Sequence, residues 1–141
     1  MEKKKVPPLQ VDVSKVRPLI FGEEYESRMI LDHEITGRDD VIQINHGTVK
    51  AGYALGGASH EEDEIYYILS GKGKLQLDDK IIEIAADQVV FIPAGCFHAL
   101  DNRESKEDMC ILTFWRDWRY NDAYEARIKL WGKSFKTIDE D

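Results

Sequence analysis

The sequence predicts an all-β domain, a barrel or sandwich of short strands followed by one short helix. Three observations support this fold class. Between residues 27 and 115, apolar and polar residues alternate in short runs, as strands with one buried face require. Clusters of turn-forming residues separate the runs, among them Gly37-Arg-Asp-Asp, Gly56-Gly57 and Asp78-Asp79. After residue 121 the alternation gives way to a helical period.

Residues 1–18 are expected to form an extended N-terminal arm. The segment contains three consecutive lysines and three prolines, and proline favours extended backbone and sheet edges. Val11 and Val13 alternate with polar residues, so an edge strand is predicted within the arm.

The barrel is expected to span residues 19–118. Its predicted strands combine β-branched and aromatic residues with a period of two: Arg28 to Ile35, Val41 to Ile44, Thr48 to Leu55, Ile65 to Leu69, Lys74 to Leu77, Ile81 to Ile84, Val89 to Ile92, and Met109 to Trp115. Between the second and third of these strands, Asn45-His-Gly47 predicts a turn. His46 would then face solvent.

The C-terminal part, residues 119–141, is expected to contain a helix over residues 123–131. Asp122 and Glu125 have the spacing of a capping box, and Gly132 can end the helix in a left-handed conformation. Three apolar residues share one face of this helix and would pack it on the barrel: Tyr124, Ile128 and Trp131.

Length and composition indicate one globular domain of 141 residues. No apolar stretch approaches the roughly 20 residues that span a bilayer, and no apolar region follows the basic N-terminus as in a secretory signal. We therefore expect a cytoplasmic protein without a membrane partner. The net charge of −8 disfavours a nucleic-acid partner, because such binding neutralises phosphates with Lys and Arg. The two cysteines, Cys96 and Cys110, are expected to be reduced thiols.

The strongest signal lies between residues 52 and 102, where the sequence resembles the two signature motifs of the cupin superfamily. The first motif is G-x5-H-x-H-x3-E-x6-G, and the chain matches it at Gly52, His60, Glu64 and Gly71. Ala58 stands where the first histidine of the motif belongs.

The second motif, G-x5-P-x-G-x2-H-x3-N, matches at Pro93, Gly95, His98 and Asn102. Asp87 replaces its leading glycine, a mild departure because Asp can adopt the left-handed turn conformation. The resemblance implies a cupin double-stranded β-helix, a jelly-roll barrel, with a short C-terminal helix added. It also implies a metal ion held by His60, Glu64 and His98.

The chemistry of these three side chains is consistent with that implication. Glu64 and Tyr66 share one face of a predicted strand, because successive side chains in a strand alternate. His60 and His98 each follow a backbone reversal, and in a small closed barrel such strand entrances can converge. Two imidazoles and one carboxylate would leave positions open on the metal for water, substrate or dioxygen.

Ala58 leaves two alternatives for this site. In the first, the metal stays on the three remaining ligands and has an extra open position. In the second, the site has lost its metal and has become a binding cavity. We favour the first, because sites with three protein ligands are common in catalytic zinc and iron proteins.

The resemblance implies a metal-dependent enzyme acting on a small organic molecule, with one divalent ion (Fe, Mn, Ni or Zn) as cofactor. Oxygenase chemistry is favoured over isomerase, epimerase or lyase chemistry, because non-heme iron(II) oxygenases use a 2-His-1-carboxylate set. Tyr66 is the candidate catalytic residue, as a hydrogen-bond donor or an acid or base. The alternative is a non-catalytic module that binds or senses a sugar-like ligand. A homodimer is expected, because small cupins commonly pair. His33 and Cys96 are interpreted as packing or surface residues rather than ligands.

Overall fold

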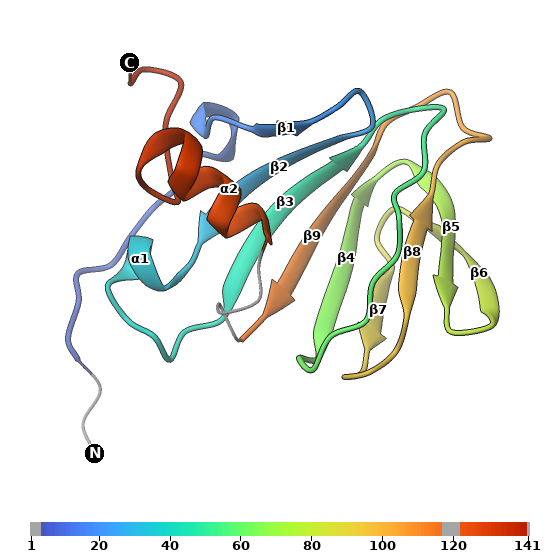
Figure 1. Ribbon diagram of the computed structural model, residues 1–141, viewed down its shortest axis with the longest axis horizontal. Coiled ribbons are helices and arrows are strands. Elements are labelled where there is room, and N and C mark those ends of the chain that lie inside the picture. The colour runs from blue at the N-terminus through green and yellow to red at the C-terminus, as the bar shows by residue number, and fades with distance from the viewer. Residues whose placement is uncertain (1–3, 117–121, 141) are drawn as a thin grey trace.

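A computed structural model describes residues 4–116 and 122–140. These residues form two antiparallel sheets and short helices (Figure 1). The strands are β1 (Leu19–Phe21), β2 (Tyr25–Leu31), β3 (Gln43–Val49), β4 (Glu64–Ser70), β5 (Lys72–Leu77), β6 (Lys80–Ala85), β7 (Val89–Ile92), β8 (His98–Asp101) and β9 (Met109–Trp115). The helices are the 3-10 turn η1 (Val13–Lys15), α1 (His33–Thr36) and α2 (Asp122–Trp131). The predicted all-β class with a short C-terminal helix is confirmed.

The core lies between a six-stranded sheet, in the order β1-β2-β3-β9-β4-β7, and a three-stranded sheet, in the order β6-β5-β8. Five apolar side chains from both sheets are at most 2% exposed and form its centre: Ile68, Leu75, Ile84, Ile92 and Met109. The smaller sheet covers only part of the larger one (Figure 1). Over β2 the same inner face is contacted by α2, whose Arg127 reaches Ser27.

The helix predicted over residues 123–131 is confirmed, and Gly132 follows it with φ of +73° and donates to the carbonyl of Ile128. Tyr124, Ile128 and Trp131 are half-buried, as the predicted packing face requires. The Asp122 side chain, on which the predicted capping box depends, lies outside the described residues. Asp87 has φ of +68°, so it takes the left-handed conformation expected of the motif glycine it replaces.

The predicted turn at Asn45-His-Gly47 is wrong, because these residues lie inside the continuous strand β3, which ends at Val49. A Cβ at Gly47 would lie 2.5 Å from the hydroxyl of Tyr25, so the glycine provides room for that ring. His46 is consequently half-buried rather than solvent-facing, and burial together with Arg28 lowers its pKa.

The predicted strand over residues 28–35 is too long, because β2 ends at Leu31 and α1 follows. Asp32 caps α1 by accepting from the backbone N–H of Ile35, and Gly37 ends it with φ of +72°. His33 therefore lies on a helix, where its ring contacts Tyr124.

Two further differences concern the arm and the strand list. The predicted edge strand through Val11 and Val13 is wrong, because Asp12 instead caps the 3-10 turn η1. Strands β1 and β8 are absent from the predicted set.

Within the described ranges, no helix is both long and apolar enough to cross a membrane.

Candidate metal centre

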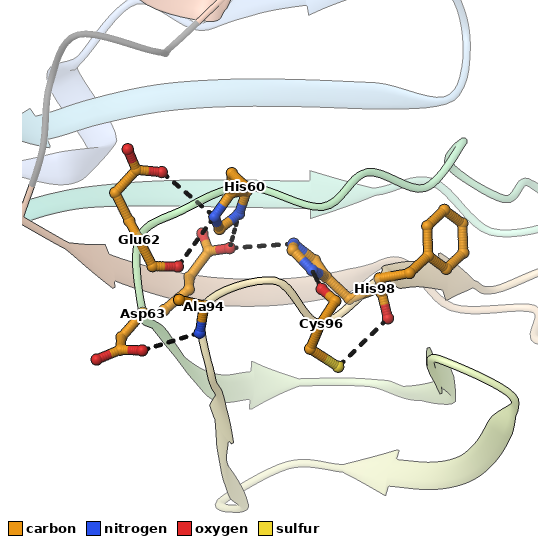
Figure 2. A network of polar contacts seen from close by, with 8 residues as sticks. His60, Glu62, Asp63, Ala94, Cys96 and His98 are labelled. Carbon is orange, nitrogen blue, oxygen red and sulfur yellow. Dashed lines mark hydrogen bonds and ion pairs between the residues drawn. The ribbon is translucent and has the colours of Figure 1, made fainter.

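Three side chains converge at one end of the barrel interior (Figure 2). Glu64 is the first residue of β4, His60 lies in the loop before it, and His98 begins β8. The potential ligand atoms of the three all lie within 4.8 Å of one another. The structure therefore brings together the three residues that the motifs single out.

The spacing of these atoms suits a metal ion. The Nε2 atoms of His60 and His98 each lie 3.2 Å from Oε1 of Glu64. With metal–ligand bonds of about 2.1 Å, adjacent ligand atoms lie about 3.0 Å apart in an octahedral site and about 3.4 Å apart in a tetrahedral one. These two separations fall between the octahedral and tetrahedral values, and the third pair of ligand atoms lies within 4.8 Å, so the spacing is compatible with a bound ion.

The hydrogen bonds of the two imidazoles also favour a cation here. Nδ1 of His60 lies 3.0 Å from the carbonyl oxygen of Glu62, and Nδ1 of His98 lies 3.0 Å from that of Cys96. Carbonyls only accept, so both Nδ1 atoms carry protons, and each Nε2 atom either carries a second proton or directs a lone pair at Glu64. Lone pairs facing a carboxylate repel unless a proton or a metal ion lies between them. Metal-binding histidines commonly donate their other N–H to a carbonyl in this way.

Protonation of Nε2 is the alternative to metal binding at His98. Burial by itself lowers the pKa of this imidazole, but the hydrogen bonds to Glu64 and to the Cys96 carbonyl outweigh burial, so the pKa lies above its ordinary value. A bound divalent ion would replace that proton, since metal binding requires a neutral imidazole.

The two loops that carry the histidines are joined by their own hydrogen bonds. The backbone N–H of Gly95 donates to the carbonyl of His60 over 2.7 Å. The N–H of Ala94 donates to Oδ1 of Asp63 over 2.9 Å (Figure 2). Gly95 has φ of +83°, a left-handed conformation that a glycine adopts without strain. The loops are therefore connected without any metal.

Ala58 is paired with His98 through two backbone hydrogen bonds of 3.1 and 3.0 Å. Residues directly opposite each other in an antiparallel pair direct their side chains to the same face. The methyl group of Ala58 therefore projects to the His98 side and is exposed.

A cavity of about 440 Å³ adjoins two of the three side chains, those of His60 and Glu64. Its wall includes His60, Glu64 and Tyr66, together with aromatic, apolar and polar residues of the six-stranded sheet and Ala123 of α2. Tyr66 lies two residues along β4 from Glu64 and presents its ring edge-on to His98, with centroids 6.1 Å apart. Burial, Glu64 and Tyr25 raise the pKa of Tyr66 well above its ordinary value, so the phenol keeps its proton.

Several cavity residues were missed by sequence reasoning, among them the polar residues Tyr25, Ser27 and Asn45. Asn45 and Gly47 could have pointed to this part of the cavity. Asn and Gly are unfavourable inside a strand, and where they occur there they often mark the close approach of another group. Trp115 also lines the cavity, and Cys96 packs against the core.

Comparison with known proteins identifies the family. The model of the cupin domain family matches residues 38–115, more than half of the chain. The chain is a cupin. An uncharacterized protein of Streptomyces coelicolor is 25% identical to it over 75 residues, which cover 53% of this cupin and 70% of the relative.

Solved structures agree on the fold. A predicted oxalate decarboxylase from Thermotoga maritima has 24% identity and a TM-score of 0.68, with 77% of this cupin and 98% of that chain covered. The polyketide cyclase RemF from Streptomyces resistomycificus has 19% identity and a TM-score of 0.69, with 82% and 89% covered. At these identities the likeness concerns the fold, which hosts more than one chemistry.

Proposed function

We propose that this cupin is a metal-dependent enzyme that acts on a small organic molecule. The observation that carries the proposal is the convergence of two imidazole Nε2 atoms on the carboxylate of Glu64, beside a cavity large enough for a small substrate. Structural neighbours with oxalate decarboxylase and polyketide cyclase in their names support a catalytic role for such a barrel.

The residues divide into two roles. His60, Glu64 and His98 hold the divalent ion, and their carbonyl partners fix both imidazole rings. The ion supplies a Lewis acid with open positions for substrate, water or dioxygen. Tyr66 donates its phenolic hydrogen to the substrate, because its raised pKa keeps the hydroxyl protonated.

Oxygenase chemistry is our first choice of reaction class, ahead of isomerase, epimerase and lyase chemistry. Two histidines and one carboxylate are the set that non-heme iron(II) oxygenases use, and iron is accordingly our first choice of metal. A non-catalytic module that binds a sugar-like ligand is the alternative.

Metal analysis of the protein purified without chelator tests the proposal. We expect about one iron, manganese, nickel or zinc ion per chain. Oxygen uptake in the presence of candidate substrates would then separate oxygenase chemistry from isomerase and lyase chemistry. A chain that is folded, free of metal and unable to bind added Fe(II), Mn(II), Ni(II) or Zn(II) would favour the binding module and contradict the enzyme.

We also propose that this cupin forms a homodimer through the outer face of β4 and β7. Ile65 and Phe91 lie opposite each other there and are 41% and 58% exposed, and β7 is an edge strand. Phe91→Glu should reduce the mass measured by light scattering to that of one subunit, whereas Leu130→Glu, at an exposed position on α2, should not. A wild-type mass of one subunit at micromolar concentrations would contradict the dimer.

A further inference from the structure

Arg127 is a buried cation with unused hydrogen-bond donors. Its side chain extends from α2 to the inner face of the six-stranded sheet, is 1% exposed, and directs Nη1 at the hydroxyl oxygen of Ser27 over 3.3 Å. Within the described residues, its Nε and Nη2 atoms have no hydrogen-bond partner. Because a guanidinium group can only donate, the oxygen of Ser27 must accept this bond.

The direction of this first bond sets the direction of the next two. Having accepted from Arg127, Ser27 donates its own hydrogen to Oδ1 of Asn45 over 2.6 Å. The amide of Asn45 is thereby oriented with Nδ2 toward Tyr25, whose phenolic oxygen accepts over 3.2 Å. A series of donors thus runs from α2 across β2 and β3 and ends at a phenol.

The hydroxyl hydrogen of Tyr25 is left without an acceptor in the described part of the chain. Tyr25 lines the 440 Å³ cavity, and its hydroxyl lies against β3 where Gly47 has no side chain. A Cβ at position 47 would have to displace this hydroxyl. The position of the hydroxyl is therefore determined by neighbouring residues, and the bond from Asn45 leaves its hydrogen available to another acceptor.

The cavity wall indicates what chemistry would meet this hydrogen. Aromatic rings of Phe21, Tyr25 and Trp115 line it, and the first two have centroids 5.8 Å apart, so a flat ring compound has surfaces to pack against. Glu24 and Glu62 also line it, and no Lys or Arg is among the described lining residues. Carboxylates near a ligand disfavour an anion.

We propose that the hydroxyl of Tyr25 is a substrate-binding donor for an uncharged cyclic compound that carries a carbonyl oxygen, and that Arg127 is the positioning residue that directs it. This inference rests on the proposed function in one respect, since it takes the cavity beside the metal centre to be the substrate site. It assigns to that site a substrate class, and it assigns roles to Tyr25, Ser27, Asn45 and Arg127.

A matched pair of probes tests the donor. Acetophenone and α-methylstyrene have nearly the same shape and differ in a carbonyl oxygen against a methylene group. Titration of the purified, full-length protein followed by NMR should show acetophenone binding about 3- to 10-fold more tightly, the range that one hydrogen bond of about 0.5–1.5 kcal/mol contributes. Tyr25→Phe should abolish this preference and leave the affinity for α-methylstyrene within about twofold.

A second set of variants tests the positioning role of Arg127. Ser27→Ala and Arg127→Met should each weaken the preference, whereas Arg127→Lys, which can still donate to Ser27, should restore part of it. Tyr67→Phe is the matched control, because that hydroxyl lies outside the cavity and donates to Asp87. If Arg127→Met does not fold, Ser27→Ala decides, since it removes only one oxygen atom from the middle of the series.

The proposal is overturned if Tyr25→Phe keeps the preference or if neither probe binds. His60→Ala separates this result from a failure of the proposed function. A preference that persists in His60→Ala and is lost in Tyr25→Phe arises at Tyr25, whereas one that disappears in His60→Ala arises at the metal and overturns the role of Tyr25. A wild-type protein that shows the preference but retains no metal would contradict the proposed metal-dependent enzyme, and the role of Tyr25 as a donor would still hold.

Discussion

The two halves of the barrel interior are built from the same strands but from different side chains. Along the inner face of β4, the half with the cavity carries Glu64 and then Tyr66, and the opposite half carries Ile68, which is fully buried. On β9 the cavity half carries Thr113 and the apolar half carries Met109, which is also fully buried. We call these the cavity half and the apolar half.

The difference between the halves shows how stability and chemistry can be divided within one fold. Each fully buried aliphatic side chain of the apolar half stabilises the fold by about 1.5–3 kcal/mol. In the cavity half, an unsatisfied buried donor such as those of Arg127 costs about 1–3 kcal/mol. The apolar half therefore offsets polar groups whose arrangement serves a ligand rather than the fold.

The largest expected effect is on metal retention in the cavity half. His60→Ala and His98→Ala should each abolish retention during dialysis against a chelator, because only two of the three ligands remain. Circular dichroism should show that the barrel is still folded. His46→Ala, at a half-buried histidine outside the site, should keep its metal; if that variant alone lost the ion, our ligand assignment would be wrong.

A substitution in the apolar core should lower the stability of the fold and leave metal binding unchanged. Ile68→Ala in the apolar half should lower the free energy of unfolding by about 2–5 kcal/mol in urea titrations, because it leaves a cavity among fully buried side chains. The folded fraction should still bind metal with unchanged stoichiometry. Loss of metal at concentrations of urea where the protein remains folded would show that the halves are not separable.

Ala58→His should fill the vacant position in the cavity half. Ala58 shares its face with His98, so an imidazole there can reach the ion. We expect about tenfold tighter binding of Fe(II), Mn(II) and Zn(II), equivalent to about 1.4 kcal/mol, in competition with a chelator. Turnover should fall once a substrate is known, because catalytic metals work through an open position.

The neighbouring exposed residue Ser59 supplies the control, because alternation directs it away from the side that Ala58 occupies. Ser59→His should leave metal affinity unchanged. Equal affinity in wild type and Ala58→His would mean that no ion lies beside this position, and the three-ligand site would have to be abandoned.

The smallest expected effect lies at the surface of the apolar half, where Arg103 holds the pKa of Asp101 at about 2. A carboxyl whose pKa is lowered on folding contributes stability above its ordinary pKa of 3.8, and this contribution is lost as the pH falls through about 2. Asp101→Asn should therefore lower stability by less than about 1 kcal/mol at pH 7. Thermal unfolding of the variant and wild type should converge near pH 2, and a difference that persisted there would contradict this cause.

The comparison of halves also explains what sequence reasoning could find. Alternation alone predicts that Glu64 and Tyr66 share one face, because the period of a strand is a local property. The turn that precedes His98 is likewise local, since proline and glycine specify it within a few residues. The C-terminal helix was accessible for the same reason, whereas the side-chain trio of the candidate metal centre came from the resemblance to the two cupin motifs.

What was missed depends on distant contacts. Asn45 and Gly47 favour a turn locally, but Gly47 lies within β3 because the ring of Tyr25, from the neighbouring strand, occupies the space beside it. Arginine is seldom fully buried, yet the side chain of Arg127 is 1% exposed and contacts Ser27, 100 residues earlier in the chain. Neither of these contacts can be predicted from the propensities of the local sequence.

The pairing of Ala58 with His98 has a consequence for how such a site can change. Position 58 is bonded to position 98 only through its backbone N–H and carbonyl groups, and every residue except proline provides both groups in the same form. The side chain there contributes nothing that holds the two segments together. The number of protein ligands around the ion can therefore be altered by a single substitution at position 58 while the barrel stays the same, so coordination number is a property that evolution can adjust independently of architecture.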